Sequence, residues 1–207
     1  MKSVNMLLLT GGLLVGGLWL GWAGSGPPAV AQRGRALLAA WRVVPLGNGP
    51  NEVDLDGDGA ADLVFMARRE NYNAHSHNIF LFFVFAGGTW HAVPFPGLDG
   101  HPEKYALGTV SGADCDLRDI RVLRPPESVP DSAALVVVGQ RKTGASYGDS
   151  APVAFTLYRL RVGRAAEPGE PPFFFEMADF LPATRPYCDI QTAFATELGL
   201  GSYETPR

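Results

Sequence analysis

Short apolar blocks alternate with polar residues along most of this chain, and glycine, proline and asparagine separate the blocks. Long stretches with a hydrophobic repeat of 3.6 residues, which would predict amphipathic helices, are scarce. The blocks predict β-strands at residues 40–44, 62–67, 78–86, 89–95, 118–123, 134–139, 153–162 and 172–175. We therefore expect a mainly β protein made of antiparallel sheets in a sandwich-like arrangement.

Two of the predicted strands differ in how they should be buried. Every position from Ile79 to Phe85 is apolar, which predicts a strand that is covered on both faces. Val153, Phe155 and Leu157 instead alternate with smaller or more polar residues, which is typical of a strand covered on one face. Gly87-Gly88 follows the first of these strands and predicts a tight hairpin into the next strand.

One segment near the end of the chain predicts a short helix. Asp189 can cap its first turn, and Ile190, Phe194 and Leu198 follow at four-residue spacing. Gly199 then provides a residue that ends a helix easily. We expect this helix to cover one face of a sheet.

The beginning of the chain has the pattern of a secretory signal. Lys2 precedes an uncharged apolar stretch at residues 6–22, and Ala29-Val30-Ala31 provides an Ala-x-Ala cleavage site. An uncleaved membrane anchor is the alternative, because this stretch approaches the length that spans a bilayer. Its glycines and the break at Pro27-Pro28 favour cleavage. We predict a signal peptide at residues 1–31 and a periplasmic or secreted protein that has no membrane association after cleavage.

Residues 32–207 are predicted to form a single exported domain, because the proline-rich stretches within them are too short to be domain linkers. An internal similarity links residues 63–69 to residues 135–141, each followed by an aromatic strand. It suggests two related halves, at about 45–110 and 111–200. Duplication and two unrelated hairpins of similar composition both explain this similarity.

Charge and cysteine content narrow the possible functions. The formal net charge is −4 and the arginines are scattered, which argues against nucleic acid as a partner.

The chain has two cysteines, Cys115 and Cys188. In an oxidising compartment such a pair predicts a disulfide, with two unpaired buried thiols as the alternative.

An aspartate-rich loop carries the sharpest chemical motif. Its carboxylates alternate around a glycine, as they do at the start of calcium-binding loops, where a tight turn directs alternate side chains to one point. The predicted Ca²⁺ ligands are Asp54, Asp56, Asp58, Ala60 (through its carbonyl) and Asp62. The twelfth position is Phe65 and not glutamate, so the loop resembles VCBS and FG-GAP repeats rather than an EF-hand. Asx turns that hold no metal are the alternative.

A second polar cluster lies between two predicted strands. Its hydrogen-bonding side chains predict a recognition loop. The residues chosen as ligand-binding are Arg69, Asn71, Asn73, His75 and His77. The His-x-His pair lacks the neighbouring ligands of a zinc enzyme. An ordered, solvated loop without a ligand is the alternative.

Catalytic signatures are absent from the sequence. It contains no Gly-x-Ser-x-Gly elbow, no Ser-x-x-Lys motif and no phosphate-binding glycine loop. We therefore predict that the protein is not an enzyme.

The aspartate-rich loop at residues 53–64 and the polar run at residues 69–75 together resemble the CarG-like family. These are exported, non-enzymatic proteins associated with intrinsic carbapenem resistance and self-immunity. The resemblance implies a periplasmic protein that protects by binding, with a β-lactam or a cell-wall-related ligand or protein as its partner. It also implies a homodimer. A different class of function stays open: a calcium-stabilised structural or adhesive β-module that binds protein or glycan partners.

Overall fold

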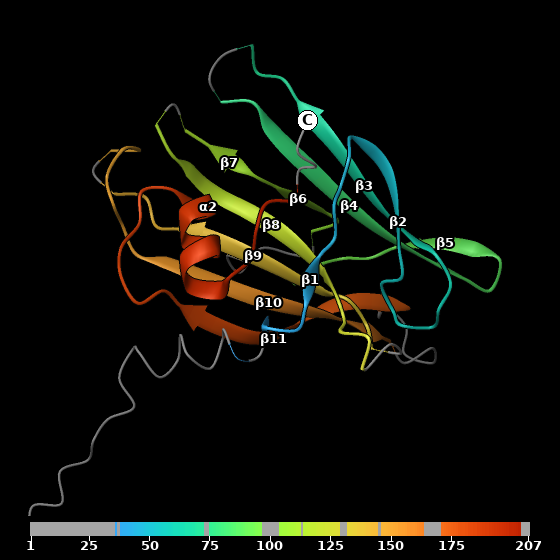
Figure 1. Ribbon diagram of the computed structural model, residues 1–207. Coiled ribbons are helices and arrows are strands. Elements are labelled where there is room, and N and C mark those ends of the chain that lie inside the picture. Colours follow the sequence, from blue (N-terminus) through green and yellow to red (C-terminus); the bar gives the residue numbers. More distant parts are fainter. Residues whose placement is uncertain are drawn as a thin grey trace, which may run out of the picture.

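The computed structural model describes residues 36, 38–72, 75–96, 104–112, 114–128, 132–144, 146–163 and 171–203. The predicted signal peptide lies outside these residues. Within them, no helix has both the length and the apolar character needed to cross a membrane. The described part of the chain is dominated by two antiparallel β-sheets that face each other (Figure 1).

The first sheet, called here the large sheet, has the order β1-β8-β9-β10-β11, and β7 pairs with β8. Its strands are β1 (Arg42–Val43), β7 (Val110–Ser111), β8 (Asp116–Arg124), β9 (Leu135–Arg141), β10 (Val153–Val162) and β11 (Phe173–Pro182). The second, or small, sheet has the order β2-β3-β4-β5, and β6 pairs with β4. Its strands are β2 (Gly49–Val53), β3 (Asp62–Arg69), β4 (His77–Ala86), β5 (Thr89–Ala92) and β6 (Ala106–Gly108). The predicted fold class is thus confirmed.

The two sheets come largely from consecutive parts of the chain. Strands β2 to β6 build the small sheet, whereas β7 to β11 build most of the large one. The two similar segments become β3 and β9, and each lies between two neighbours of its own sheet. Whether the halves arose by duplication stays a prediction.

The main core lies between the sheets and is rich in aromatic rings. Phe82 of β4 meets Phe95 and Phe175, with ring centroids 5.3 and 5.2 Å away. Phe95 and Phe175 stack on each other at 4.2 Å. All three rings are buried, so residues from both sheets contribute to one apolar layer.

The two faces of β4 are not equally covered. Phe80, Phe82 and Val84 point into the core and are buried. On the opposite face, Leu81 is only half-buried and Phe85 is 43% exposed. The expectation that both faces are covered is therefore met on one face only. The other face stays apolar and open among the described residues.

The predicted helix is present and covers the outer face of the large sheet (Figure 1). It consists of α2 (Ile190–Ala193), which continues as the wider turn η1 (Phe194–Leu198). Asp189 accepts hydrogen bonds from the backbone of the first turn, and Gly199 ends the helix with a φ of 69°. A Cβ atom at Gly139 of β9 would lie 2.7 Å from the Phe194 ring, so glycine allows the close approach.

The Cys115–Cys188 disulfide is confirmed, with a Cα–Cα distance of 5.7 Å. It joins the start of β8 to the residue before the helix cap. Replacing both cysteines with serine should lower the free energy of unfolding by about 2–4 kcal/mol, because the unfolded chain regains the freedom that the closed loop removes. Urea unfolding of the double variant and of the wild type, each with and without reductant, measures this. An equal effect of reductant on both proteins would contradict the prediction.

Candidate functional site

The aspartate-rich loop connects β2 to β3 and holds three carboxylates close together. Asp54, Asp56 and Asp58 each offer an oxygen, and these oxygens lie within 4.8 Å of one another. Backbone N–H groups support the loop: Asp54 accepts from Gly57 at 2.7 Å and from Gly59 at 3.0 Å. Hard oxygen donors converging in this way match the preference of Ca²⁺.

The other two predicted ligands hold different positions. Asp62 is 2% exposed, and its two oxygens accept the N–H groups of Leu55 at 2.9 Å and Phe85 at 3.0 Å. It therefore fastens the loop to β4. Ala60 is exposed, and its N–H donates to Asp58 at 2.7 Å.

The electrostatics of this loop favour a cation. Burial raises the pKa of Asp56, and the neighbouring carboxylates of Asp62, Asp58 and Asp54 raise it further. Burial also raises the pKa of Asp62, against the effect of its backbone hydrogen bonds. A bound divalent cation would relieve this repulsion.

The predicted recognition loop joins β3 to β4 and is organised by its own polar contacts. Asn71 donates from its side chain to the His75 carbonyl at 2.8 Å. The His75 ring nitrogen Nδ1 lies 3.1 Å from the Ser111 carbonyl of β7. Arg69 pairs with His77 across β3 and β4. Asn73 lies outside the described residues.

Two adjoining cavities lie beside this loop. The first, called here the loop cavity, has a volume of about 370 Å³ and is lined by Asn71, His75 and His77 together with Thr109, Ser111, Val110 and Tyr147. The second, the polar cavity, has a volume of about 190 Å³ and shares His77, Thr109 and Ser111 with the first. The structure thus brings three of the predicted ligand-binding residues to one cavity. Arg69 lines neither.

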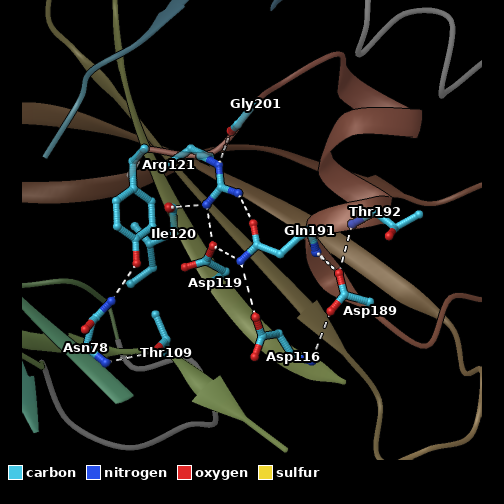
Figure 2. A network of polar contacts seen from close by, with 11 residues as sticks. Asn78, Thr109, Asp116, Asp119, Ile120, Arg121, Asp189, Gln191, Thr192 and Gly201 are labelled. Atoms are coloured by element: carbon cyan, nitrogen blue, oxygen red, sulfur yellow. Dashed lines mark hydrogen bonds and ion pairs between the residues drawn. The ribbon is translucent and has the colours of Figure 1, made fainter. Parts of the chain in front are cut away.

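A buried polar network forms one wall of the polar cavity (Figure 2). Arg121 of β8 is 1% exposed and donates to the carbonyls of Gly201 at 2.6 Å and Ile120 at 2.9 Å. It also donates to Asp119 and to the side chain of Gln191. Gln191 in turn donates to Asp119 at 2.6 Å. The network therefore ties β8 to α2 and to the C-terminal segment.

Aromatic rings complete the surroundings of Arg121. Its guanidinium carbon lies 4.4 Å from the centre of the Phe194 ring and 5.3 Å from that of Tyr203. The Tyr203 hydroxyl accepts a hydrogen bond from the Asn78 side chain at 2.7 Å. Asn78 is in β4, so this contact links the network to the small sheet.

Two buried atoms at this wall have no hydrogen-bond partner among the described residues: Oδ1 of Asp119 and Nε of Arg118. Burial raises the pKa of Asp119, and the guanidinium of Arg121 opposes that effect. Neither residue is among the site residues predicted from the sequence. The available signal was a pair of opposite charges, Asp119 and Arg121, two residues apart and so on one face of the predicted strand at residues 118–123.

Comparison with known proteins bears on the family and the fold of this chain. The family model described as "Carbapenem resistance protein CarG-like" matches residues 46–196. A crystal structure of CarG is similar with a TM-score of 0.61 and 23% identity, covering 75% of this chain and 98% of that one. At that identity the likeness establishes the fold alone. A search of curated proteins found no match. The family match spans most of the chain, and the protein therefore belongs to the CarG-like family.

Proposed function

We propose that this protein is a periplasmic, non-catalytic member of the CarG-like family that protects against carbapenems by binding. The observation that carries the proposal is the convergence of Asn71, His75 and His77 on the loop cavity. These side chains offer hydrogen-bond donors and acceptors, and the exposed ring of Tyr147 adds an apolar contact surface beside them. The family's description supports the antibiotic context.

The ligand of the loop cavity is proposed to be a β-lactam or a cell-wall fragment. Isothermal titration of the purified protein with a carbapenem, and separately with peptidoglycan fragments, tests this directly. Binding without turnover supports the proposal. Hydrolysis of the carbapenem, or no binding of any of these compounds, would overturn it.

Replacing His77 with alanine should remove protection without unfolding the protein. His77 lines both cavities, so its loss removes hydrogen-bonding groups from the walls. We expect the affinity for the ligand to fall about tenfold, the cost of one hydrogen bond. The measurements are the titration above, the minimal inhibitory concentration of a carbapenem for cells that export the variant, and the melting temperature.

The matched control for His77→Ala is Val162→Ala, at an exposed position of β10 that lines neither cavity. This control should retain both affinity and protection. If His77→Ala lost protection only together with its melting transition, a structural role for His77 would be indicated instead.

We also propose that the aspartate-rich loop binds Ca²⁺ through Asp54, Asp56 and Asp58. The Ala60 carbonyl would add a further ligand, and Asp62 would support the loop through its backbone hydrogen bonds. The clustering of three carboxylates supports this. The same site would serve the alternative function, a calcium-stabilised adhesive module. That alternative gains support if calcium changes binding to protein or glycan surfaces while carbapenem protection is absent.

Adding millimolar Ca²⁺ to chelator-treated protein should raise the free energy of unfolding by about 1–2 kcal/mol, as expected for an extracellular-type site of modest affinity. Asp58→Asn removes one charged ligand and should abolish most of this gain. Asp179→Asn, a change at a half-buried position of β11 in the other sheet, should leave it unchanged. Scanning calorimetry measures all three proteins. An identical curve of the wild type with Ca²⁺ and with chelator would rule out the site.

We propose, finally, that the protein forms a homodimer through the open face of the small sheet. Aromatic and aliphatic residues from three neighbouring strands share this face, which is called here the apolar face: Phe65, Leu81, Phe83, Phe85 and Trp90. Phe65 lies opposite Leu81, and the Phe85 and Trp90 rings lie 5.0 Å apart. A second copy presenting the same face about a twofold axis would bury these residues symmetrically.

A further inference from the structure

We infer that a third cavity binds a small organic carboxylate through Arg42 and Arg124. This cavity, called here the arginine cavity, has a volume of about 690 Å³. It is lined by residues of β1 and β2, the edge strands of the two sheets, which lie next to each other in Figure 1. It shares no lining residue with the loop cavity or the polar cavity, so binding here is independent of the proposed protective function.

The two arginines lie directly opposite each other on neighbouring strands. Arg42 of β1 pairs with Arg124 of β8 in antiparallel register, and both side chains are exposed. Residues paired in this way point to the same face of the sheet, with Cβ atoms about 4.5–5.5 Å apart. Val122, two residues before Arg124 on the same face of β8, is buried in the core between the sheets. Both arginines therefore lie on the side of the large sheet that faces the small sheet, and one ligand in the cavity can reach both of them.

Neither guanidinium forms an ion pair or a hydrogen bond with any residue that the structure describes. Like charges directly opposite each other destabilise a pair of strands. The arginine pair therefore weakens the attachment of β1 to β8 unless an anion lies between the two guanidinium groups. A bound carboxylate would remove this repulsion, because the N–H groups of both arginines can donate to its oxygens.

The walls of the arginine cavity are held in place by backbone hydrogen bonds. On one side, the N–H of Val44 donates to the Val122 carbonyl at 2.8 Å, which fastens the chain after β1 to β8. On the other side, the N–H of Ala134 donates to the Leu55 carbonyl at 3.0 Å, which ties the aspartate-rich loop to the large sheet. Because the walls are already ordered, a ligand does not have to order them when it binds.

The uncharged lining residues define the body of the ligand. Most of them are apolar: Ala40, Val44, Val53, Pro125 and Pro126. Val53 is buried, and Val44 packs against the core between the sheets. The volume lies within the range of about 300–1,000 Å³ that is typical of small-molecule pockets. A carboxylate attached to a compact apolar group therefore matches this cavity.

Acidic residues around the arginine pair limit the charge of the ligand. Glu52, Asp54 and Glu127 line the same cavity, which sets three negative charges against the two positive ones. Asp54 is turned onto its own loop, where it accepts from the N–H groups of Gly57 and Gly59. These carboxylates repel a phosphate group with two negative charges more strongly than a carboxylate with one. We therefore expect monocarboxylates to bind in preference to phosphates and phosphonates.

The test is binding of matched small molecules to the purified protein, measured by titration calorimetry and by the NMR signals of the arginine Nε–Hε groups. The probes are benzoate, cyclohexanecarboxylate and hexanoate, each with its uncharged amide, and phenylphosphonate as the more highly charged counterpart of benzoate. We expect at least one carboxylate to shift the signals of Arg42 and Arg124. It should bind at least about tenfold more tightly than its amide, the worth of one charge-assisted hydrogen bond. Equal affinity of acid and amide, tighter binding of phenylphosphonate than of benzoate, or no binding of any carboxylate would overturn the inference.

Two single variants and a control locate the site. Arg42→Gln and Arg124→Gln should each weaken carboxylate binding about tenfold, because each removes one of the two cationic donors. Without ligand, each should leave the melting temperature unchanged or raise it, because the repulsion between the arginines is relieved. Arg159→Gln is the matched control, since Arg159 is an exposed arginine of β10 that lines none of the three cavities. It should retain the wild-type affinity.

Two results with these variants would count against the site. Unchanged affinity in both arginine variants would place carboxylate binding elsewhere. A lower melting temperature of both variants in the absence of ligand would mean that the arginines stabilise the fold, and the repulsion on which the inference rests would be refuted. All of these changes lie outside the loop cavity, so failure here is distinguishable from failure of the proposed function.

Discussion

Replacement of Arg121 by methionine is expected to lower the free energy of unfolding by about 3–5 kcal/mol, because it leaves Asp119 as a buried charge without its cation. Both side chains are almost fully buried, and their ion pair lies beneath the helix. The loss also removes the donors to Gly201 and Ile120, whose carbonyl oxygens accept from the guanidinium. Urea unfolding followed by circular dichroism gives the free energy.

Two further variants separate the ion pair from the loss of packing. The double variant Arg121→Met/Asp119→Leu removes both charges and should recover much of the stability, because burying two apolar groups avoids the cost of desolvating a pair. Arg161→Met is the matched control. Its ion pair with Glu176 is exposed at both ends, so the change should stay below about 1 kcal/mol. A small loss in Arg121→Met itself would mean that packing against Phe194 and Tyr203, rather than charge pairing, holds the helix in place.

The elements predicted correctly are those whose signal is local. The strand at residues 153–162 coincides with β10. The expectation that it is covered on one face is wrong: Val153, Phe155 and Leu157 pack toward the helix, whereas Tyr158 and Leu160 lie in the core between the sheets. The helix follows from the cap at Asp189 and from Ile190, Phe194 and Leu198, all three of which are buried. The strand predicted at residues 172–175 is too short, because β11 continues to Pro182 through Met177 and other exposed residues that lack the alternation.

The strands that were not predicted are short and lie beside longer ones. Strand β2 reads Gly-Pro-Asn-Glu-Val, a composition typical of turns, and becomes a strand only because it pairs with β3. Strands β6 and β7 consist of three and two residues. At that length, periodicity carries no information, and pairing with β4 or β8 decides the conformation.

The candidate site also contains both contacts that the sequence could predict and contacts that it could not. Asn71, His75 and His77 are close in sequence, so their clustering could be foreseen. Asp119 and Gln191 are 72 residues apart, and their contact depends on the disulfide and the helix that bring the C-terminal segment over β8. The sequence could not distinguish the roles of the aspartates either. A carboxylate that caps a backbone N–H, as Asp62 does, and one that binds a metal occupy the same motif.

Substituting Phe85 with glutamate is expected to dissociate the proposed dimer almost completely. Phe85 is 43% exposed on the apolar face, next to Trp90, which is 50% exposed. In a twofold interface each substitution acts twice, so two anchor losses of about 2 kcal/mol each would raise the dissociation constant about 10³-fold. Sedimentation velocity over a concentration series measures the dissociation constant, and the melting temperature shows that the monomer stays folded.

Phe180→Glu is the matched control, because Phe180 has comparable exposure but lies on β11 of the other sheet. This variant should retain the wild-type dissociation constant. A monomeric wild type at every concentration would refute the dimer, and dissociation by Phe180→Glu alone would place the interface on the large sheet. The expected pattern follows from one physical requirement: a strand as apolar as β4 is most stable in water when both of its faces are covered. The described chain buries the face with Phe80, Phe82 and Val84 and leaves the opposite face half-buried or exposed.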